Sequence, residues 1–334
     1  MTVVSIGDMA RQFTSLRDGS AIKSELFELA ESLSSGKVAD LTKSLNGDTA
    51  RFSGVQYSLT QLDGYLQVAS ETEQTLGNIQ IILNKVDNTR ARTVESLLLV
   101  NESSTTAQVD EAARASQSSF EEMVTALNTR IADRALMSGN SVNTTPLVAA
   151  DDMLAGLQTA IGASLDPATI IATVDTWFND PAGGFAATGY QGDTGGPIER
   201  RVTEDQSIRI DARADDPAVK QVLQGAALAA LADMLPGLDR AAKVDLLTNA
   251  ASQLYGSASS LVAVQARVGF AENSVARAQT ETGAQQTTLR QVANDLSLAD
   301  PFETASRLQA QQTQLETFFS LTARLSQLSL LRFI

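Results

Sequence analysis

The sequence predicts a mainly α protein, an elongated antiparallel helical rod that carries a small mixed α/β insert, and three observations support this class. Residues 51–100 and 244–298 contain no proline and repeat apolar residues three, four or seven apart, which is the period of a helix. Six of the seven prolines fall between residues 141 and 238, where long helices are therefore not expected. Aromatic residues make up only 5% of the chain, so the core must be filled by smaller apolar side chains, which suits packed helices.

The start of the chain predicts helices with two apolar stripes. One stripe repeats at spacings of four, three and four and consists of Ile22, Leu26, Leu29 and Leu33. An earlier, separately phased stripe consists of Met9, Phe13 and Leu16. Breaks are expected at residues 34–36, Ser-Ser-Gly, and at 46–48, Asn-Gly-Asp, because these residues favour turns.

Two antiparallel helices are expected next. A continuous helix over residues 51–100 would reach about 75 Å at 1.5 Å per residue. A turn follows at 101–106, where Thr105 and Gln108 have the spacing of a capping box for the next helix. We expect that second helix to run to Leu136 and to end at Ser138-Gly139-Asn140.

The middle of the chain predicts a compact mixed segment. Short helices are expected within residues 161–178, and residues 198–211 alternate in a way that predicts a β-hairpin turning near Glu204-Asp205. Residues 218–235 return to a helical pattern.

The last third predicts a second rod and a closing helix. Gly256, Gly269 and Gly283 are the weak points of the rod over 244–298. Asp300-Pro301 marks a break, since proline suits the first turn of a new helix. The stripe of the closing helix consists of Leu315, Phe318, Leu321, Leu325, Leu328 and Leu331.

These patterns predict three domains. Residues 1–40 and 300–334 would form a terminal helical assembly domain, because isolated amphipathic helices need a partner to bury their apolar faces. Residues 41–140 and 240–299 would form a helical rod domain. Residues 141–239 would form the small mixed insert domain.

Charge and composition narrow the classes of partner and site. A net charge of −14 and a pI near 4.5 argue against nucleic acid and against an anionic membrane surface. The chain has no Cys and no His, which removes disulfides, thiolate metal sites and the commonest general base. We expect no cofactor and no metal. Residues 1–10 lack a basic region and a continuous apolar run, so export without a cleaved signal peptide is expected.

One Gly-rich stretch resembles the sequence motifs of two protease classes. Gly192-Asp193-Thr194-Gly195-Gly196-Pro197 resembles the nucleophile segment of trypsin-like proteases with Thr in place of Ser, but no His is present to take the hydroxyl proton. Asp193-Thr194-Gly195 is also the triplet of aspartic proteases, which need two such carboxylates, and only one copy occurs. A turn leading into a strand is therefore predicted.

Two pairs of adjacent acids could serve as acid and base or bind Ca²⁺. These pairs are Asp151-Asp152 and Asp215-Asp216. Neither lies in the spaced pattern of a calcium loop, and adjacent acids often flank helix starts, where the macrodipole favours them. We expect helix-start or solvated surface roles and no catalytic residue. A secreted carboxylate-dependent hydrolase that uses Asp151 or Asp193 stays open as an alternative.

Several segments resemble the flagellin superfamily of axial proteins. Ser32-Leu33-Ser34-Ser35-Gly36-Lys37 is similar to a stretch near the start of those proteins, and residues 324–334 are similar to their C-terminal ending. Within the superfamily the resemblance is greatest to the hook-associated proteins of the hook-filament junction. It is carried by residues 135–139 followed by Asn143-Thr144-Thr145-Pro146, and by Tyr190-Gln191-Gly192-Asp193 with the hairpin after it. The short stretch 41–48 and the ending Arg332-Phe333-Ile334 depart from the flagellin pattern.

This resemblance implies a structural, non-enzymatic subunit of the bacterial flagellum that is extracellular and joins the hook to the filament in motility. Its N- and C-terminal helices would self-assemble, in the manner of a coiled coil, with each other and with neighbouring copies in a ring or tier. The implied partners are a neighbouring hook-associated protein, flagellin, and the flagellar export apparatus, with an export chaperone as an optional partner. A filament-forming flagellin is the first alternative, and a helical adhesin or effector is a further one. The predicted assembly residues are Met9, Phe13, Ile22, Leu26, Leu29, Leu315, Phe318, Leu325, Leu328 and Leu331.

Overall fold

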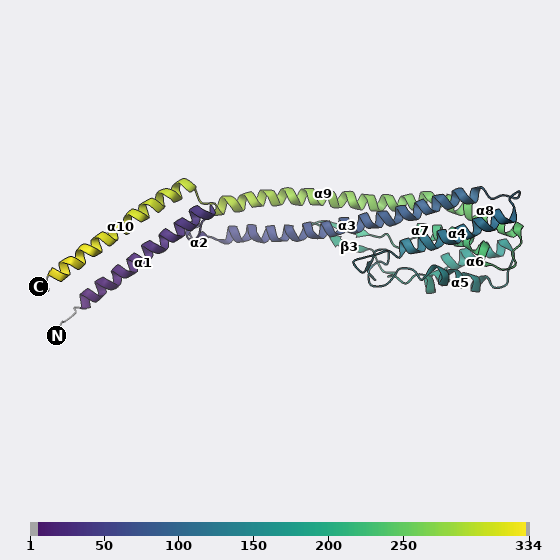
Figure 1. Ribbon diagram of the computed structural model, residues 1–334, viewed down its shortest axis with the longest axis horizontal. Coiled ribbons are helices and arrows are strands. Elements are labelled where there is room, and N and C mark those ends of the chain that lie inside the picture. Colours follow the sequence, from purple (N-terminus) through teal and green to yellow (C-terminus); the bar gives the residue numbers. More distant parts are fainter. Residues whose placement is uncertain (1–5, 332–334) are drawn as a thin grey trace. The chain divides into compact units, whose positions relative to one another are not determined.

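The computed structural model describes the backbone of residues 6–331 and the side chains of residues 9–10 and 12–324 (Figure 1). The chain forms two compact units: residues 1–63 with 283–334, here unit 1, and residues 64–282, here unit 2. The predicted mainly α class is confirmed, with two short β-hairpins as the sheet content of the described residues. The predicted division into three domains stays a prediction.

Unit 1 contains the terminal helices α1 (Ile6–Ser35) and α10 (Pro301–Leu331) and the short α2 (Leu41–Ser44). The expected breaks are confirmed: α1 ends before Gly36, which has a φ of 69°, and Asn46 and Gly47 also have positive φ, at 53° and 85°. Such values are accessible to Gly and Asn at low cost. Two backbone hydrogen bonds, Val38 N–H to the Ser297 carbonyl at 2.9 Å and Ala299 N–H to the Gly36 carbonyl at 3.1 Å, connect the segment that follows α1 with the residues that precede α10.

The helix α3 (Ala50–Leu98) begins in unit 1 and continues into unit 2, where α4 (Thr106–Leu127) follows it. The capping box at the start of α4 is confirmed. The Thr105 N–H donates to Gln108 Oε1 at 2.8 Å, and the Gln108 N–H donates to Thr105 Oγ1 at 3.4 Å. Two N–H groups that a helix start leaves unpaired are thereby satisfied.

The predicted end of this helix at Leu136 is wrong, because α4 ends at Leu127. The side chain of Asn128 ends the helix: its amide donates to the Leu147 carbonyl and its oxygen accepts from the Leu147 N–H, both at 2.9 Å. A small hairpin of β1 (Arg130–Ile131) and β2 (Arg134–Ala135) follows. Its two turn residues, Ala132 and Asp133, adopt positive φ values of 47° and 60°, as tight hairpin turns require.

The second rod is interrupted, which was not predicted. It consists of α8 (Arg240–Gly256) and α9 (Ala258–Ser297). Ser257 lies between them, fully buried, and its hydroxyl donates to the Leu254 carbonyl at 2.8 Å. A serine that bonds to the preceding helical turn offers the backbone an alternative to the regular ladder.

The middle segment contains α5 (Ala150–Ile161), α6 (Pro167–Asn179), a π-helical turn η1 (Phe185–Gly189) and α7 (Pro217–Met234). It has the predicted hairpin, a helix within the range predicted for short helices and the predicted helix near residues 218–235, but α5 and η1 were not predicted. The hairpin of β3 (Ile198–Arg201) and β4 (Ser207–Ile210) is antiparallel, with Arg201 opposite Ser207. The predicted turn at residues 204–205 therefore lies at its tip.

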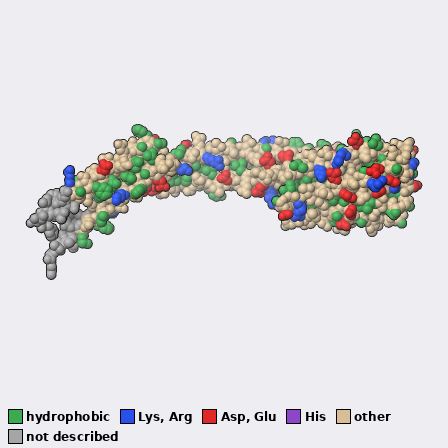
Figure 2. Space-filling model, in the orientation of Figure 1, with side chains coloured by type: hydrophobic (Ala, Val, Ile, Leu, Met, Phe, Trp, Pro, Cys, Tyr) green, Lys and Arg blue, Asp and Glu red, His purple; other side chains and the backbone are tan. Residues whose placement is uncertain are grey.

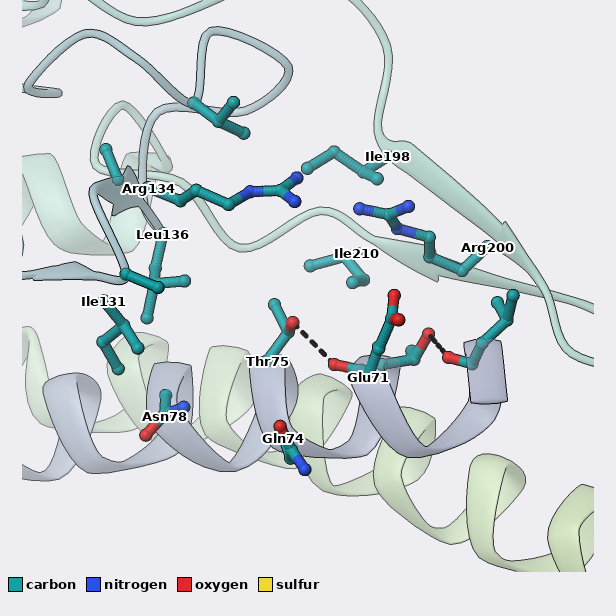
Figure 3. Close-up of a pocket in the computed structure, with 15 residues that line it drawn as sticks. Glu71, Gln74, Thr75, Asn78, Ile131, Arg134, Leu136, Ile198, Arg200 and Ile210 are labelled. Atoms are coloured by element: carbon teal, nitrogen blue, oxygen red, sulfur yellow. Dashed lines mark hydrogen bonds between the residues drawn. The ribbon is translucent and has the colours of Figure 1, made fainter. Parts of the chain in front are cut away.

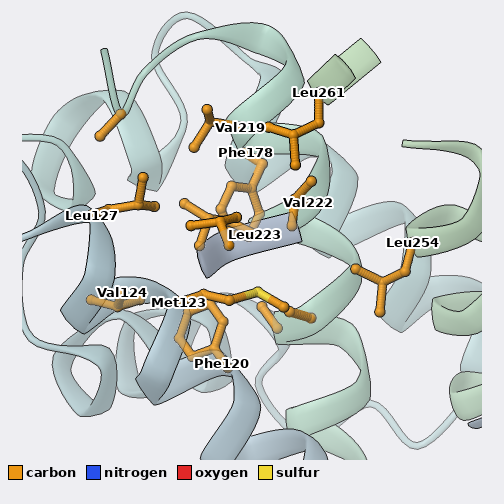
Figure 4. Packing of buried hydrophobic residues seen from close by; sticks show 14 of the residues in the cluster. Phe120, Met123, Val124, Leu127, Phe178, Val219, Val222, Leu223, Leu254 and Leu261 are labelled. Carbon is orange, nitrogen blue, oxygen red and sulfur yellow. The ribbon is translucent and has the colours of Figure 1, made fainter. Parts of the chain in front are cut away.

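The core of unit 2 is built around α7. This helix packs against α4 and α8 and also contacts α5 and α6. Figure 4 shows Leu223 of α7 among Phe120 and Met123 of α4 and Phe178 of α6, and all four side chains are at most 1% exposed. Gly225 permits the close approach of α8, because a Cβ there would lie 2.9 Å from Leu254 Cγ.

Candidate assembly interface

The helices α1 and α10 of unit 1 pack against each other. They run antiparallel (Figure 1), and Gly19 lies against Phe318, since a Cβ at Gly19 would be 2.9 Å from Phe318 Cε1. Because the helices are antiparallel, Ile22 then lies level with Leu315, and Leu29 lies level with Leu308. These side chains are half-buried. We call this contact the seam; it consists of Gly19, Ile22, Leu26, Leu29, Leu308, Leu315 and Phe318.

Polar contacts fix the edges of the seam. Ser32 is 7% exposed; its hydroxyl donates to the Glu28 carbonyl at 2.7 Å and accepts from the Ala39 N–H at 3.0 Å. The Lys23 ammonium lies 5.4 Å from the centre of the Phe319 ring, a favourable cation–π distance. The end of α1 and the pairing of the two helices are thus both specified by side chains.

A second apolar face of α1 points away from the seam. Successive residues of a helix are rotated by about 100°. The side chains of Met9, Phe13, Leu16 and Phe27 therefore fall within an arc of about 60° around the helix axis, centred roughly 120° from the seam. Their exposed fractions lie between 64% and 72%, and Figure 2 shows apolar side chains gathered on the surface of the terminal helices. We call this face the outer stripe; it consists of Met9, Phe13, Leu16 and Phe27.

The predicted assembly residues divide between these two faces. Met9 and Phe13 lie on the outer stripe. The predicted residues that lie in the seam are Ile22, Leu26, Leu29, Leu315 and Phe318. The side chains of Leu325, Leu328 and Leu331 lie outside the described residues. That any of these residues contacts another subunit stays a prediction.

Three exposed phenylalanines in the described part of unit 1 were not predicted. Phe27 is 70% exposed, Phe302 83% and Phe319 50%. Phe27 follows Leu16 by eleven residues, which is three helical turns, so this longer spacing could have placed it on the outer stripe. Phe302 follows the proline that opens α10, and no periodic signal distinguishes it.

The protease-like stretch of unit 2 is a turn, as predicted. Asp193 Oδ1 accepts from the Gly195 N–H at 2.9 Å and Oδ2 accepts from the Asn140 amide at 2.8 Å. These bonds, first that from Gly195, hold the pKa of the Asp193 carboxyl below its usual value, which keeps it ionised and unsuited to donate a proton. Burial raises the pKa of the nearby Tyr190, whose hydroxyl donates to the Asp193 carbonyl at 3.1 Å. The carboxylate is thereby used to fasten the turn before β3.

The acid pairs also have structural positions. Asp151 and Asp152 lie in the first turn of α5, as predicted. Asp215 pairs with Arg213 at 2.9 Å, and Asp216 caps α7 and pairs with Arg267 at 2.6 Å. Among the described residues, no group of three or more Asp or Glu side chains is arranged to hold a metal ion.

The terminal region has a family match. Residues 244–334 match the bacterial flagellin C-terminal helical region. The resemblance to the flagellin superfamily is confirmed. The match includes all of α9 and α10, so the α10 half of the seam belongs to a region that this superfamily shares. In the described part of the chain, no helix is both long and apolar enough to cross a membrane.

One solved structure of a flagellar protein shares the fold. A Vibrio parahaemolyticus protein assigned as a flagellar hook-associated protein superposes with a TM-score of 0.51 at 12% identity, covering 74% of this chain and 96% of its own. At that identity the likeness establishes a common fold. The match to Bacillus cereus FlgL covers 73% of this chain and 99% of that protein at 12% identity. Its TM-score of 0.44 is too low to establish a common fold. No curated protein matches the sequence at a significant level.

Proposed function

We propose that this protein is a structural subunit of the bacterial flagellum that joins the hook to the filament. The observation that carries the proposal is the outer stripe: the pairing of α1 with α10 covers one apolar face and leaves a second one exposed. The flagellin C-terminal match over residues 244–334 supports the assignment to the flagellum.

The outer stripe offers apolar surface that a subunit contact would bury. Its members include two phenylalanines, Phe13 and Phe27, that are 72% and 70% exposed. Fully burying an apolar side chain contributes about 1.5–3 kcal/mol, so four such residues contribute several kcal/mol to each contact between copies. A contact in which the stripe of one copy meets a different surface of the next is heterologous, and repeated contacts of this kind close into rings or extend into helical tiers.

The remaining assignments follow from this role. The protein acts outside the cell at the hook-filament junction and reaches it through the flagellar export apparatus. Its neighbours there are copies of itself, a second hook-associated protein and flagellin. An enzymatic role has no support in the geometry around Asp193, whose carboxylate is bound to the turn.

A filament-forming flagellin is the second candidate, because the matching family is described as flagellin itself. The two roles share the same helix pairing and differ in copy number. Polymerisation of the pure protein into long filaments without a seed would establish the flagellin role and exclude the junction role.

The junction role is tested by truncating the chain after Asp300, which removes α10. We expect such cells to make hooks that carry no filament, to release flagellin into the medium and to lose motility. Thermal unfolding of the secreted variant checks that unit 2 stays folded. Normal attached filaments would overturn the proposal, and release of the variant without any flagellar defect would indicate an adhesin or effector instead.

A further inference from the structure

A recess in unit 2 lies between α3 and the two β-hairpins and has a volume of about 360 Å³. Its walls combine apolar side chains, Ile198 and Ile210 of the β3–β4 hairpin, with two arginines, Arg134 of β2 and Arg200 of β3. Figure 3 shows both guanidinium groups pointing into the recess, above Glu71 of α3. We call it the arginine groove.

The two arginines of the groove have no partner, unlike their neighbours. Arg209 on β4 pairs with Glu199 at 3.8 Å, and Arg213 pairs with Asp215 at 2.9 Å. Within the described residues, the side chains of Arg134 and Arg200 form no ion pair and no hydrogen bond. A guanidinium presents a planar fork of donors that matches a carboxylate in a bidentate manner, so the groove is suited to carboxylates.

The same unit displays an acidic pair that is also without a partner. Asp151 and Asp152 are exposed at the start of α5, and neither forms an ion pair or hydrogen bond with another described side chain. They do not cap the helix, because the cap position is Ala149. The other acidic pair noted in the sequence, Asp215-Asp216, is occupied by Arg213 and Arg267.

We propose that the arginine groove of one copy binds Asp151 and Asp152 of a second copy of this chain. The inference rests on the proposed function, which brings many copies together in a ring or tier. The two arginines and the two aspartates lie on different elements of the chain, so their pairing between copies joins two different surfaces head to tail, which is the geometry of a ring or helical tier. In a chain with a net charge of −14, this contact fixes which surfaces of neighbouring copies meet, since complementary charges specify register while like charges repel.

Cysteine cross-linking tests the contact directly, because the chain has no cysteine of its own. Ile131 lines the groove and Ala155 lies one turn after Asp151 on α5. We expect Ile131→Cys and Ala155→Cys variants, co-expressed and treated with a short bis-maleimide on isolated flagella, to yield a cross-linked dimer. Ala155→Cys with Ser118→Cys, an exposed position on α4, is the matched control and yields none.

The outcomes separate this inference from the proposed function. Absence of the protein from isolated flagella overturns the proposed function and the inference with it. Presence of the protein in flagella without the specific dimer overturns the inference alone.

A charge swap gives an independent readout of the same contact. The double variant Arg134→Glu with Arg200→Glu is expected to lower the cross-link yield roughly tenfold or more, whereas Arg114→Glu with Arg277→Glu changes the net charge equally at exposed positions and leaves the yield unchanged. Adding Asp151→Arg and Asp152→Arg to the groove variant restores the yield. Failure of the swap to restore it, with melting temperatures unchanged, would overturn the pairing.

Discussion

The two units of the molecule differ in how much apolar surface they bury. In unit 2, residues 222–232 of α7 are buried without interruption, which is the pattern of a helix enclosed on all sides. In the described part of unit 1, Ala293 is the single apolar side chain that is less than 9% exposed. Unit 2 can therefore be stable by itself, whereas the helix pair of unit 1 needs further contacts.

The cause of this difference lies in the number of neighbours each helix has. The helix α7 contacts α4, α5, α6 and α8, while α1 packs against α10. A pair of helices covers one side of each member, and isolated helices gain little stability in water without such cover. The exposed outer stripe is the part of α1 that this pairing leaves uncovered.

The largest expected effect contrasts two phenylalanines. Phe120 is fully buried in unit 2, and Phe13 is 72% exposed on the outer stripe. We expect Phe120→Ala to lower the free energy of unfolding by about 3–5 kcal/mol, because it leaves a cavity, and Phe13→Ala to change it by less than about 0.5 kcal/mol. Denaturant titrations followed by circular dichroism measure both, and equal losses would remove the distinction between the units.

A smaller contrast uses two helical glycines. A Cβ at Gly225 would lie 2.9 Å from Leu254 Cγ and 3.3 Å from its backbone nitrogen, and one at Gly19 would lie 2.9 Å from the Phe318 ring. We expect Gly225→Ala to cost about 1–2 kcal/mol, since overpacking of a rigid core outweighs the gain in helix propensity. Gly19→Ala is expected to be neutral or slightly stabilising, because the half-buried ring can turn away. The urea unfolding midpoint of each variant, compared with that of the parent protein, measures both effects.

Two helix caps sharpen the comparison further. Thr105 caps α4 in unit 2, and Asp300 accepts the N–H groups of Phe302 and Glu303 at the start of α10. We expect Thr105→Ala to lower the stability of unit 2 by about 1 kcal/mol. Asp300→Ala is expected to speed amide exchange in the first turn of α10 while the melting temperature of unit 2 stays unchanged. Hydrogen exchange read by mass spectrometry reports both effects, and a shared drop in melting temperature would contradict the account.

The smallest expected effect is a dependence of the stability of unit 2 on acidic pH. The lowered pKa of Asp193 means that its contribution to the stability of unit 2 is present above the unfolded pKa of about 4 and is lost as the pH falls through the lower folded value. We therefore expect Asp193→Asn to melt below the parent protein at pH 7, with the difference narrowing towards pH 3. Asn140→Ala removes one donor to the same carboxylate. Its melting temperature should likewise lie below that of the parent protein at pH 7, by a difference that narrows towards pH 3. A difference independent of pH would show that this ionisation does not contribute.

Local signals predicted much of the fold and part of the interface. The breaks at 34–36 and 46–48, the capping box at Thr105 and the β3–β4 hairpin rest on residue types whose conformational preferences are strong. The early end of α4 depends on Asn128 bonding to Leu147, nineteen residues away, and no local pattern contains that contact. The division of the apolar residues between seam and outer stripe likewise depends on the register of α1 against α10, which the sequence of one helix does not specify.

The central claim, that the outer stripe of unit 1 is a contact between subunits, is tested most directly by charging it. Phe13→Asp with Phe27→Asp places two carboxylates on the stripe, and Phe270→Asp is the control because Phe270 is 73% exposed in unit 2. The measurement is the amount of each secreted variant that is bound to isolated hooks. We predict that binding of the stripe variant falls roughly tenfold or more while the control binds as the parent protein does. Equal binding of the stripe variant and the control would contradict the claim.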